Sequence, residues 1–245
     1  MSAVLELQNV TKRFGGLTAV KNVSFTLNEG EIVFVIGPNG AGKTTVFNLI
    51  SGFFHPNEGQ ILFCGRNISR SAPHNTARLG IGRTFQIVKP LPNLTVLENA
   101  MLGAFMHTSS VRRAEEEAEK ILNFLQMHHL KDQFANSLPL AGLKRLEIAR
   151  ALATKPKLIL LDEAVSGLTT SEALALAALV RRLPEWGVSV VGGVEHVMQV
   201  VMKISDRIVV LDYGAKIAEG KPAEVVNDPV VIEAYLGPKY KELTG

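Results

Sequence analysis

Short apolar runs without alternation recur along the chain and predict the buried strands of a parallel sheet. Strands of this type are covered on both faces, so their sequences lack the regular polar positions of a half-exposed strand. The runs lie at Ile32–Ile36, Leu158–Leu161, Ser189–Val194 and Arg207–Asp212. Three N-terminal segments alternate more between apolar and polar residues, at Leu5–Val10, Val23–Leu27 and Gln60–Phe63. Their alternation predicts a smaller antiparallel sheet with one face towards solvent.

The middle of the chain, from about Asn93 to Thr154, shows helical patterns and no convincing strand. Arg112–Met127 combines an acidic run with apolar residues at helical spacing, namely Ala118, Ile121, Leu122 and Leu125. This pattern predicts an amphipathic helix whose acidic side is most simply a solvated face. Leu143–Ala153 predicts a further helix.

Together these patterns predict one α/β domain over residues 1–245 with a helical insertion. Residues 1–92 and 155–245 are expected to form the core, which includes the antiparallel β subdomain. Residues 93–154 are expected to form the inserted helical subdomain. A chain of 245 residues is long enough for this arrangement.

Composition narrows the functional classes. With 47% hydrophobic and 20% charged residues, the chain is globular and not disordered. A net charge of +3 without a dense Lys/Arg tract gives no reason to expect nucleic-acid binding. Cys64 is the only cysteine, so no intrachain disulfide is possible and a reducing compartment is expected. No apolar run approaches the roughly 20 residues of a membrane span, and the N-terminus lacks a signal-peptide pattern, which predicts a cytoplasmic protein.

One glycine-rich stretch carries the strongest chemical signal. Gly37-Pro38-Asn39-Gly40-Ala41-Gly42-Lys43-Thr44-Thr45 matches the phosphate-binding pattern G-x-x-x-x-G-K-[ST], with a predicted strand before it and a predicted helix, Thr45–Ser51, behind it. The glycines allow successive N–H groups to form a concave anion site, and the helix start adds further donors. Lys43 would reach the β- and γ-phosphates, and the Thr44 hydroxyl would bind Mg²⁺. The alternative, an ordinary glycine-rich turn, is disfavoured by the strand–loop–helix context, so we expect a nucleoside triphosphate site.

Two carboxylates follow the apolar run Leu158–Leu161. Ligands of an open parallel sheet bind at the carboxyl ends of its strands, where Asp162 and Glu163 would emerge beside the glycine-rich loop. Asp162 could hold Mg²⁺ directly or through water, and Glu163 could orient or polarise the attacking water. Acidic residues also occur at the start of ordinary loops, so the functional interpretation of this pair depends on the glycine-rich loop earlier in the sequence.

Two further side chains are weaker candidates. His196 follows the apolar segment Val188–Val194 and could donate a hydrogen bond to the γ-phosphate or to the attacking water, although an exposed histidine at a strand end is the simpler interpretation of that stretch alone. Gln86 could sense Mg²⁺ or water, or could merely cap a loop. Gly192 and Gly193 are expected to loosen the strand that precedes His196.

In this order, the motifs resemble the ATP-binding-cassette (ABC) ATPases over essentially the whole chain. The resemblance implies a P-loop NTPase core of the ABC type that binds ATP and Mg²⁺, with Glu163, His196 and Gln86 as catalytic residues and Thr44, Gln86 and Asp162 at the metal. It also assigns Phe14 and Val20 to the nucleotide, with Phe14 at the position where an aromatic ring stacks on adenine.

Four stretches resemble more narrowly the ATP-binding subunits of branched-chain amino acid importers. They are Phe14–Val20, Gly82–Gln86, Arg145–Arg150 and Asp206–Gly214. This resemblance implies an ATPase that powers a membrane importer, with transmembrane permease subunits and a second ABC ATPase subunit as partners, held at the inner face of the cell membrane through the permease.

Other functions remain open at this point. They are an ATPase of another importer or of a lipid exporter, a nucleotide-binding regulatory subunit with little turnover, and an ABC ATPase of DNA repair or translation. The last is disfavoured because the chain has neither a long coiled-coil insertion nor a second cassette.

The segment after Gln86 predicts a partner surface. Ile87–Leu94 is apolar and stiffened by prolines, and a monomer has little reason to expose it. We expect it to line the groove that receives a cytoplasmic helix of the permease, with Leu91 and Leu94 as contacts. Burial in the core of the subunit itself is the competing explanation.

The sequence departs from the resembling family at its signature, usually Leu-Ser-Gly-Gly-Gln. The corresponding residues here are Leu138–Leu143, where Pro139 stands at the serine position and Ala141 at a glycine position. In a dimer of cassettes the signature contacts the nucleotide of the opposing subunit, so its loss weakens the partner's site. The expectation is a heterodimer; a homodimer served by the N–H groups of Ala141 and Gly142 is the alternative.

Overall fold

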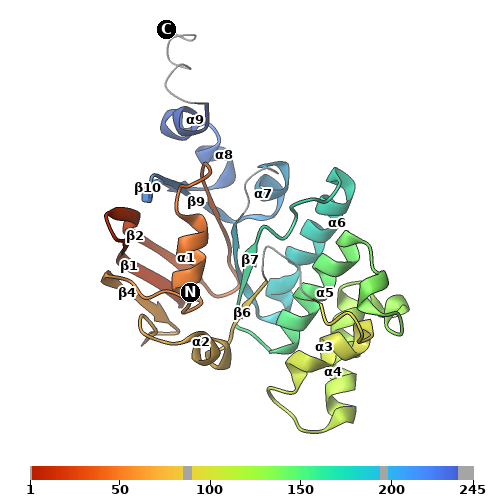
Figure 1. The fold of residues 1–245 in the computed structure, drawn as a ribbon. Helices are drawn as coiled ribbons and strands as arrows, with labels where there is room; N and C mark the ends of the chain where they lie inside the picture. The colour runs from red at the N-terminus through yellow and green to blue at the C-terminus, as the bar shows by residue number, and fades with distance from the viewer. Residues whose placement is uncertain (1, 85–89, 194–197, 237–245) are drawn as a thin grey trace.

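The structure is a computed structural model that describes residues 2–84, 90–193 and 198–236. Two sheets lie side by side and helices cover the larger one (Figure 1). The smaller sheet has the order β2-β1-β4-β5 and every neighbouring pair in it is antiparallel. Its strands are β1 (Ala3–Phe14), β2 (Leu17–Asn28), β4 (Glu58–Phe63) and β5 (Arg66–Asn67). The predicted N-terminal antiparallel sheet is confirmed, although β1 and β2 are longer than their apolar patterns.

The larger sheet has the order β10-β9-β3-β8-β7-β6. Its first five strands in the sequence run parallel, and β10 pairs antiparallel with β9 at one edge. The strands are β3 (Ile32–Ile36), β6 (Ile81–Arg83), β7 (Leu158–Asp162), β8 (Ser189–Gly193), β9 (Arg207–Asp212) and β10 (Ala215–Gly220). The predicted parallel strands are therefore confirmed, whereas the sequence patterns did not predict the edge strands β6 and β10.

Helices cover both faces of the larger sheet (Figure 1). Those of the core are α1 (Lys43–Ile50), α2 (Pro73–Leu79), α6 (Thr170–Val180), α7 (Met198–Ile204), α8 (Pro222–Val225) and α9 (Pro229–Leu236). Those of the middle of the chain are α3 (Val96–Ala104), α4 (Val111–Phe124) and α5 (Leu140–Ala153). Short 3-10 turns occur at His128–Leu130, Ala135–Ser137 and Leu183–Trp186.

Residues 93–154 contain helices and turns, joined by one isolated bridge between Thr95 and Phe134. The amphipathic helix is α4: its predicted apolar positions Ala118, Ile121 and Leu122 are buried, as is Leu125 at its C-terminus. The exact division into subdomains at residues 93 and 154 stays a prediction.

The residues of β3 alternate between two apolar cores. Ile32, Phe34 and Ile36 belong to a core formed with α3 to α7, on one face of the larger sheet. Val33 and Val35 belong to a second core, formed with α1 and the antiparallel sheet on the other face. A strand buried on both faces has no polar position, which is why its sequence reads as a continuous apolar run.

Gly192 and Gly193 allow two aromatic rings to pack against β8. A Cβ at Gly192 would lie 2.4 Å from the Phe34 ring, and one at Gly193 would lie 3.1 Å from the Phe47 ring. Both glycines are fully paired in register between β3 and β7. The structure therefore gives them a packing role where the sequence had suggested a loosened strand.

Asp206 and Arg207 anchor the start of β9 at the end of the sheet opposite the glycine-rich loop. The Ile32 N–H donates to Asp206 Oδ2 at 2.9 Å, and Arg207 Nε donates to Glu31 Oε1 at 2.8 Å. The hydrogen bond with Glu31 is the main cause that raises the pKa of the Arg207 guanidinium. These residues of the Asp206–Gly214 stretch thus hold the sheet together and do not approach the site.

Among the described residues, no helix has the length and apolar composition required to cross a bilayer.

Candidate nucleotide-binding and catalytic site

The loop between β3 and α1 is shaped by close backbone approaches at its two outer glycines. A Cβ at Gly37 would lie 2.1 Å from Leu211 O, and a Cβ at Gly42 would lie 2.4 Å from Ala19 O. Gly42 is also the N-cap of α1 in the left-handed conformation, with φ of 100°. Only glycine fits both positions, so the predicted glycine pattern is a packing requirement of the loop between β3 and α1.

Lys43 opens helix α1 and bends back over the loop. It is buried, and its Nζ donates to Gly37 O at 2.6 Å and to Pro38 O at 2.8 Å. The first helical bond of α1 runs from Val46 N–H to Gly42 O, so the preceding N–H groups lie at the positive end of the helix. A cation beside the N-terminus of a helix suits the terminal phosphates of a nucleotide.

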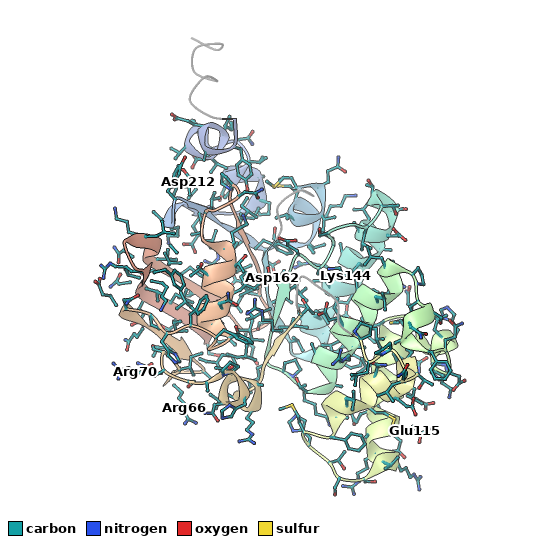
Figure 2. The ribbon with its side chains drawn as sticks, viewed as in Figure 1. Arg66, Arg70, Glu115, Lys144, Asp162 and Asp212 are labelled. Atoms are coloured by element: carbon teal, nitrogen blue, oxygen red, sulfur yellow. The ribbon has the colours of Figure 1, made fainter. Side chains whose placement is uncertain are left out.

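Asp162 and Glu163 emerge at the carboxyl end of β7, close to α1. Asp162 and Thr44 line the same groove, whose volume is about 880 Å³. A hydroxyl and a carboxylate on one cavity provide the hard oxygen ligands that Mg²⁺ prefers, so these two side chains fit a metal held beside a bound nucleotide. Figure 2 shows Asp162 near the centre of the molecule, where the sheet meets the helices of the middle segment.

The backbone of Glu163 is held in a conformation that non-glycine residues rarely adopt. Its φ is 49°, in the left-handed region. Its N–H donates to Gly193 O at 2.9 Å, and its carbonyl accepts from Ser166 N–H at 3.1 Å and from Lys144 Nζ at 3.2 Å. Strain of this kind persists where surrounding contacts over-determine a residue, and it is common in active sites. Neighbours on β8, on α5 and in the loop after β7 therefore fix the backbone of Glu163.

Lys144 was not predicted as a site residue. It comes from α5 and is buried, and Figure 2 places it close to Asp162 at the end of β7. A lysine among the apolar positions of a helix is the signal that could have indicated it, because a fully buried lysine needs polar partners.

Phe14 lies at the end of β1 with 40% of its surface exposed. The Phe54 ring meets it edge-on at 5.0 Å, and Lys12 Nζ lies 5.1 Å from its ring centroid. These contacts hold the ring while leaving part of it accessible, which suits stacking on a base. Val20, in contrast, is completely buried in the core beneath β2, so its predicted contact with a nucleotide gains no support.

The β9–β10 turn contacts the loop between β3 and α1, and the sequence did not predict this contact. The Gly214 N–H donates to Ala41 O at 3.1 Å, and Gly214 O accepts from Lys21 N–H at 2.7 Å. A Cβ at Gly214 would lie 2.8 Å from Ala19 O. Close packing next to the site therefore explains why the stretch Asp206–Gly214 ends in a glycine.

A family model described as ABC transporter matches residues 20–166, more than half of the chain and including the phosphate loop and both carboxylates. The chain belongs to the ABC transporter family. A second model, described as Branched-chain amino acid ATP-binding cassette transporter, matches residues 215–237, which include β10, α8 and α9.

Curated relatives match this ABC transporter ATPase over almost its whole length. A protein named probable branched-chain amino acid transport ATP-binding protein LivG, from Archaeoglobus fulgidus, is 40% identical and the match covers 98% of both chains. BraF of Pseudomonas aeruginosa and LivG of Escherichia coli, both named high-affinity branched-chain amino acid transport ATP-binding proteins, are each 40% identical, with 96% of this chain and 98% of theirs covered.

Solved structures agree with the fold. The ADP conformation of MJ1267, an ATP-binding cassette of an ABC transporter, superimposes with a TM-score of 0.88 at 34% identity and covers 97% of this chain and 100% of that one. A dimeric post-hydrolysis state of the cassette MJ0796, bound to ADP and Pi, gives a TM-score of 0.78 at 29% identity, with 89% and 98% covered. As a member of this family, the chain is an ATP-binding and ATP-hydrolysing transporter subunit, and the predicted P-loop core of the ABC type is confirmed.

Two predicted ABC site residues fall outside the described ranges. Gln86 lies in 85–89 and His196 in 194–197, so their roles stay predictions. Of the predicted permease segment Ile87–Leu94, the described part has Leu91 exposed and Leu94 half-buried. Neither leucine lines the groove that contains Asp162. The buried side chain of Asn99 holds this loop, because its Nδ2 donates hydrogen bonds to Leu91 O and Leu94 O.

The segment predicted to correspond to the ABC signature forms the start of α5. Pro139 is its N-cap and supplies no side-chain hydrogen bond to the helix, and the first helical bond runs from Leu143 N–H to Pro139 O. Leu140, Ala141 and Gly142 occupy the first three helical positions, so their N–H groups precede this bond. The N–H groups of these three residues are thus kept, while position 139 has neither the serine hydroxyl nor an N–H.

Proposed function

We propose that this ABC ATPase powers the import of branched-chain or related amino acids through membrane permease subunits. The observation that carries the proposal is 40% identity, over nearly the whole chain, with proteins named as branched-chain amino acid transport ATP-binding proteins. The subunit would lie at the inner face of the membrane, bound to the permease. Another importer or a lipid exporter is the second candidate, because the permease contacts the substrate and this chain does not.

Some of the site residues would bind the nucleotide and Mg²⁺, and others would act on the attacking water. The N–H groups of the loop and Lys43 would hold the phosphates, and Thr44 and Asp162 would hold Mg²⁺, which neutralises phosphate charge when bound. Glu163 would accept a hydrogen bond from the attacking water and polarise it, with its backbone fixed by Gly193 and Lys144. His196 and Gln86 are proposed to complete the site on the γ-phosphate side.

Reconstitution tests the transport function directly. The chain is co-expressed with candidate permease subunits and a substrate-binding protein, and ATPase activity is compared between the isolated chain and the complex in vesicles. We expect turnover to rise when the binding protein carries leucine or valine. Equal turnover with and without these ligands would exclude a branched-chain amino acid importer, and turnover absent from both preparations would favour a regulatory subunit.

The groove between the sheet core and α3 is the proposed docking site for a cytoplasmic helix of the permease. Asp162 and Thr44 are among its polar lining, and exposed Phe53, Leu102 and Met106 line its apolar part. Apolar side chains left exposed around a groove of this size suit the apolar face of a helix. A partner helix here would act next to the proposed metal site.

Charged residues at the groove should uncouple transport. Leu102→Glu and Met106→Glu are each expected to lower the ATPase stimulation by the complex at least about 10-fold, because a buried carboxylate at the interface is costly to desolvate. Both positions are exposed in the isolated chain, so its thermal unfolding should change little. Phe134→Glu is the matched control, an exposed apolar residue that does not line the groove. Full stimulation in both groove variants would rule out this docking site.

A second, related ATPase subunit is proposed as the other half of the nucleotide sandwich. In that arrangement the start of α5 contacts the nucleotide of the partner, and Pro139 offers it neither a hydroxyl nor an N–H. The phosphate loop, Asp162 and Glu163 of this chain remain intact and would serve a partner with a complete signature.

Mixing experiments test the heterodimer. The pair is expected to hydrolyse ATP about 10-fold faster than this chain alone, since one lost charge-assisted hydrogen bond corresponds to roughly that factor. Pro139→Ser with Ala141→Gly should raise the activity of the chain alone. Robust, cooperative turnover of the unmodified chain across a concentration series would instead support a homodimer.

A further inference from the structure

Arg83 connects three elements of the site through its guanidinium group. It is the last residue of β6, and its Nη2 lies 3.0 Å from Asp162 Oδ2 on β7. Its Nη1 donates to Asn48 Oδ1 and to Ser51 Oγ, both at 2.7 Å. Asn48 belongs to α1 and Ser51 caps its C-terminus, so one side chain bridges β6, β7 and α1.

The ion pair between Arg83 and Asp162 is buried, unlike an ion pair on the protein surface. The side chains of Arg83 and Asp162 are only 9% and 10% exposed. In such surroundings a planar guanidinium that makes several hydrogen bonds holds a carboxylate in one orientation, and a point charge does not. The Phe53 ring, 5.5 Å from the guanidinium carbon, covers the group from the groove side.

The bridge spans the two side chains proposed to hold Mg²⁺. Thr44 lies one turn before Asn48 on α1, and Asp162 is the partner of Arg83 on β7. Because Arg83 bonds both elements, it fixes the separation between the Thr44 hydroxyl and the Asp162 carboxylate. Arg83 engages Oδ2 of the carboxylate, which leaves Oδ1 for the metal or its water.

We propose that Arg83 is the positioning residue of the metal site, which orients Asp162 relative to α1. The inference rests on the proposed Mg²⁺ site. A positive charge next to a metal ligand by itself weakens metal binding, whereas a fixed ligand geometry strengthens it. Positioning outweighs repulsion here because the guanidinium bonds the oxygen on one side of the carboxylate and is tied to α1 by two further bonds.

The test measures metal binding without turnover. Arg83→Lys and Arg83→Met are made in the full chain that also carries Glu163→Gln, and Mn²⁺ is titrated into the stoichiometric ATP complex and followed by electron paramagnetic resonance. Arg181→Lys is the matched control, because Arg181 pairs with Asp206 at 2.7 Å on the surface.

Both Arg83 variants are expected to weaken Mn²⁺ binding about 10-fold or more, as is usual when a side chain that orients a metal ligand is lost. ATP affinity in EDTA and Mn²⁺ binding to the control should stay unchanged. Full retention in Arg83→Lys would show that charge alone suffices, and tighter binding in Arg83→Met would show that Arg83 opposes the metal; either result overturns the proposal.

If the Arg83 variants do not fold, a variant that removes only one hydrogen bond of Arg83 still tests the proposal. Asn48→Ala removes one anchor and keeps the ion pair, so it should weaken Mn²⁺ binding in the same direction by a smaller factor. Unchanged binding in Asn48→Ala would then contradict the bridge. If the unmodified ATP complex binds Mn²⁺ no better than free ATP does, the proposed metal site fails, which is a result distinct from failure of the Arg83 role.

Discussion

Glu163→Gln is expected to lower ATP turnover by about 10²–10³-fold while ATP binding stays normal, because a general base contributes on this order to proton transfer. The substitution keeps the size and hydrogen-bonding capacity of the side chain and removes only the negative charge that polarises water. We expect the ATP-bound dimer to live longer as a consequence. Phosphate release measures the rate, and size-exclusion chromatography with ATP measures the lifetime of the dimer.

The structure makes this substitution a clean test of the carboxylate. The strained backbone of Glu163 is held by Gly193, Ser166 and Lys144 through main-chain atoms, and Gln leaves all three bonds possible. The matched control is Glu185→Gln, which changes an exposed surface acid paired with Arg182. If Glu163→Gln hydrolyses ATP like the parent, the key group must be sought at Asp162 or His196.

The parts of the site that sequence could predict are those encoded by neighbouring residues. The phosphate loop is one continuous stretch, and each of its features follows from local rules for glycine, a helix start and lysine. Asp162 and Glu163 are recognisable because an apolar strand ends abruptly in two acids. The same locality explains why the buried parallel strands and α4 were predicted closely.

Contacts between distant residues could not be predicted from such patterns. Arg83 meets Asp162 across 79 positions, and Lys144 meets the carbonyl of Glu163 across 19. β6 has only three residues, and its membership of the sheet depends on pairing with β7. A pattern of residue types carries no information on which partner a short edge strand finds.

Burial also changed two interpretations. Val20 was assigned to the nucleotide by resemblance; it has no exposed surface in the core, and its contact with the nucleotide stays a prediction without structural support. Gly192 was expected to loosen its strand, yet it makes room for the Phe34 ring. In both cases the deciding quantity is the distance to residues on another strand, which the sequence does not state.

Lys43→Ala is expected to weaken ATP binding by about 10–100-fold, since a charge-assisted hydrogen bond is worth roughly 1.5–3 kcal/mol. The lysine is buried over the loop, and its Nζ donates to Gly37 O and Pro38 O. Substitution by alanine removes both of these hydrogen bonds as well. Both carbonyls would then lack this partner, so part of the loss comes from a less ordered loop. Titration with a fluorescent ATP analogue measures the affinity.

Two controls separate the loss of charge at the phosphates from a general loss of structure. Lys120→Ala removes an exposed lysine from α4 and should leave the affinity unchanged. Thermal unfolding of Lys43→Ala without nucleotide reports how much the loop contributes to the fold. Stabilisation of the chain by ATP should fall with the lost affinity, because a ligand stabilises only the state that binds it. Affinity like that of the parent chain, in a folded Lys43→Ala variant, would mean that the loop between β3 and α1 does not hold the phosphates.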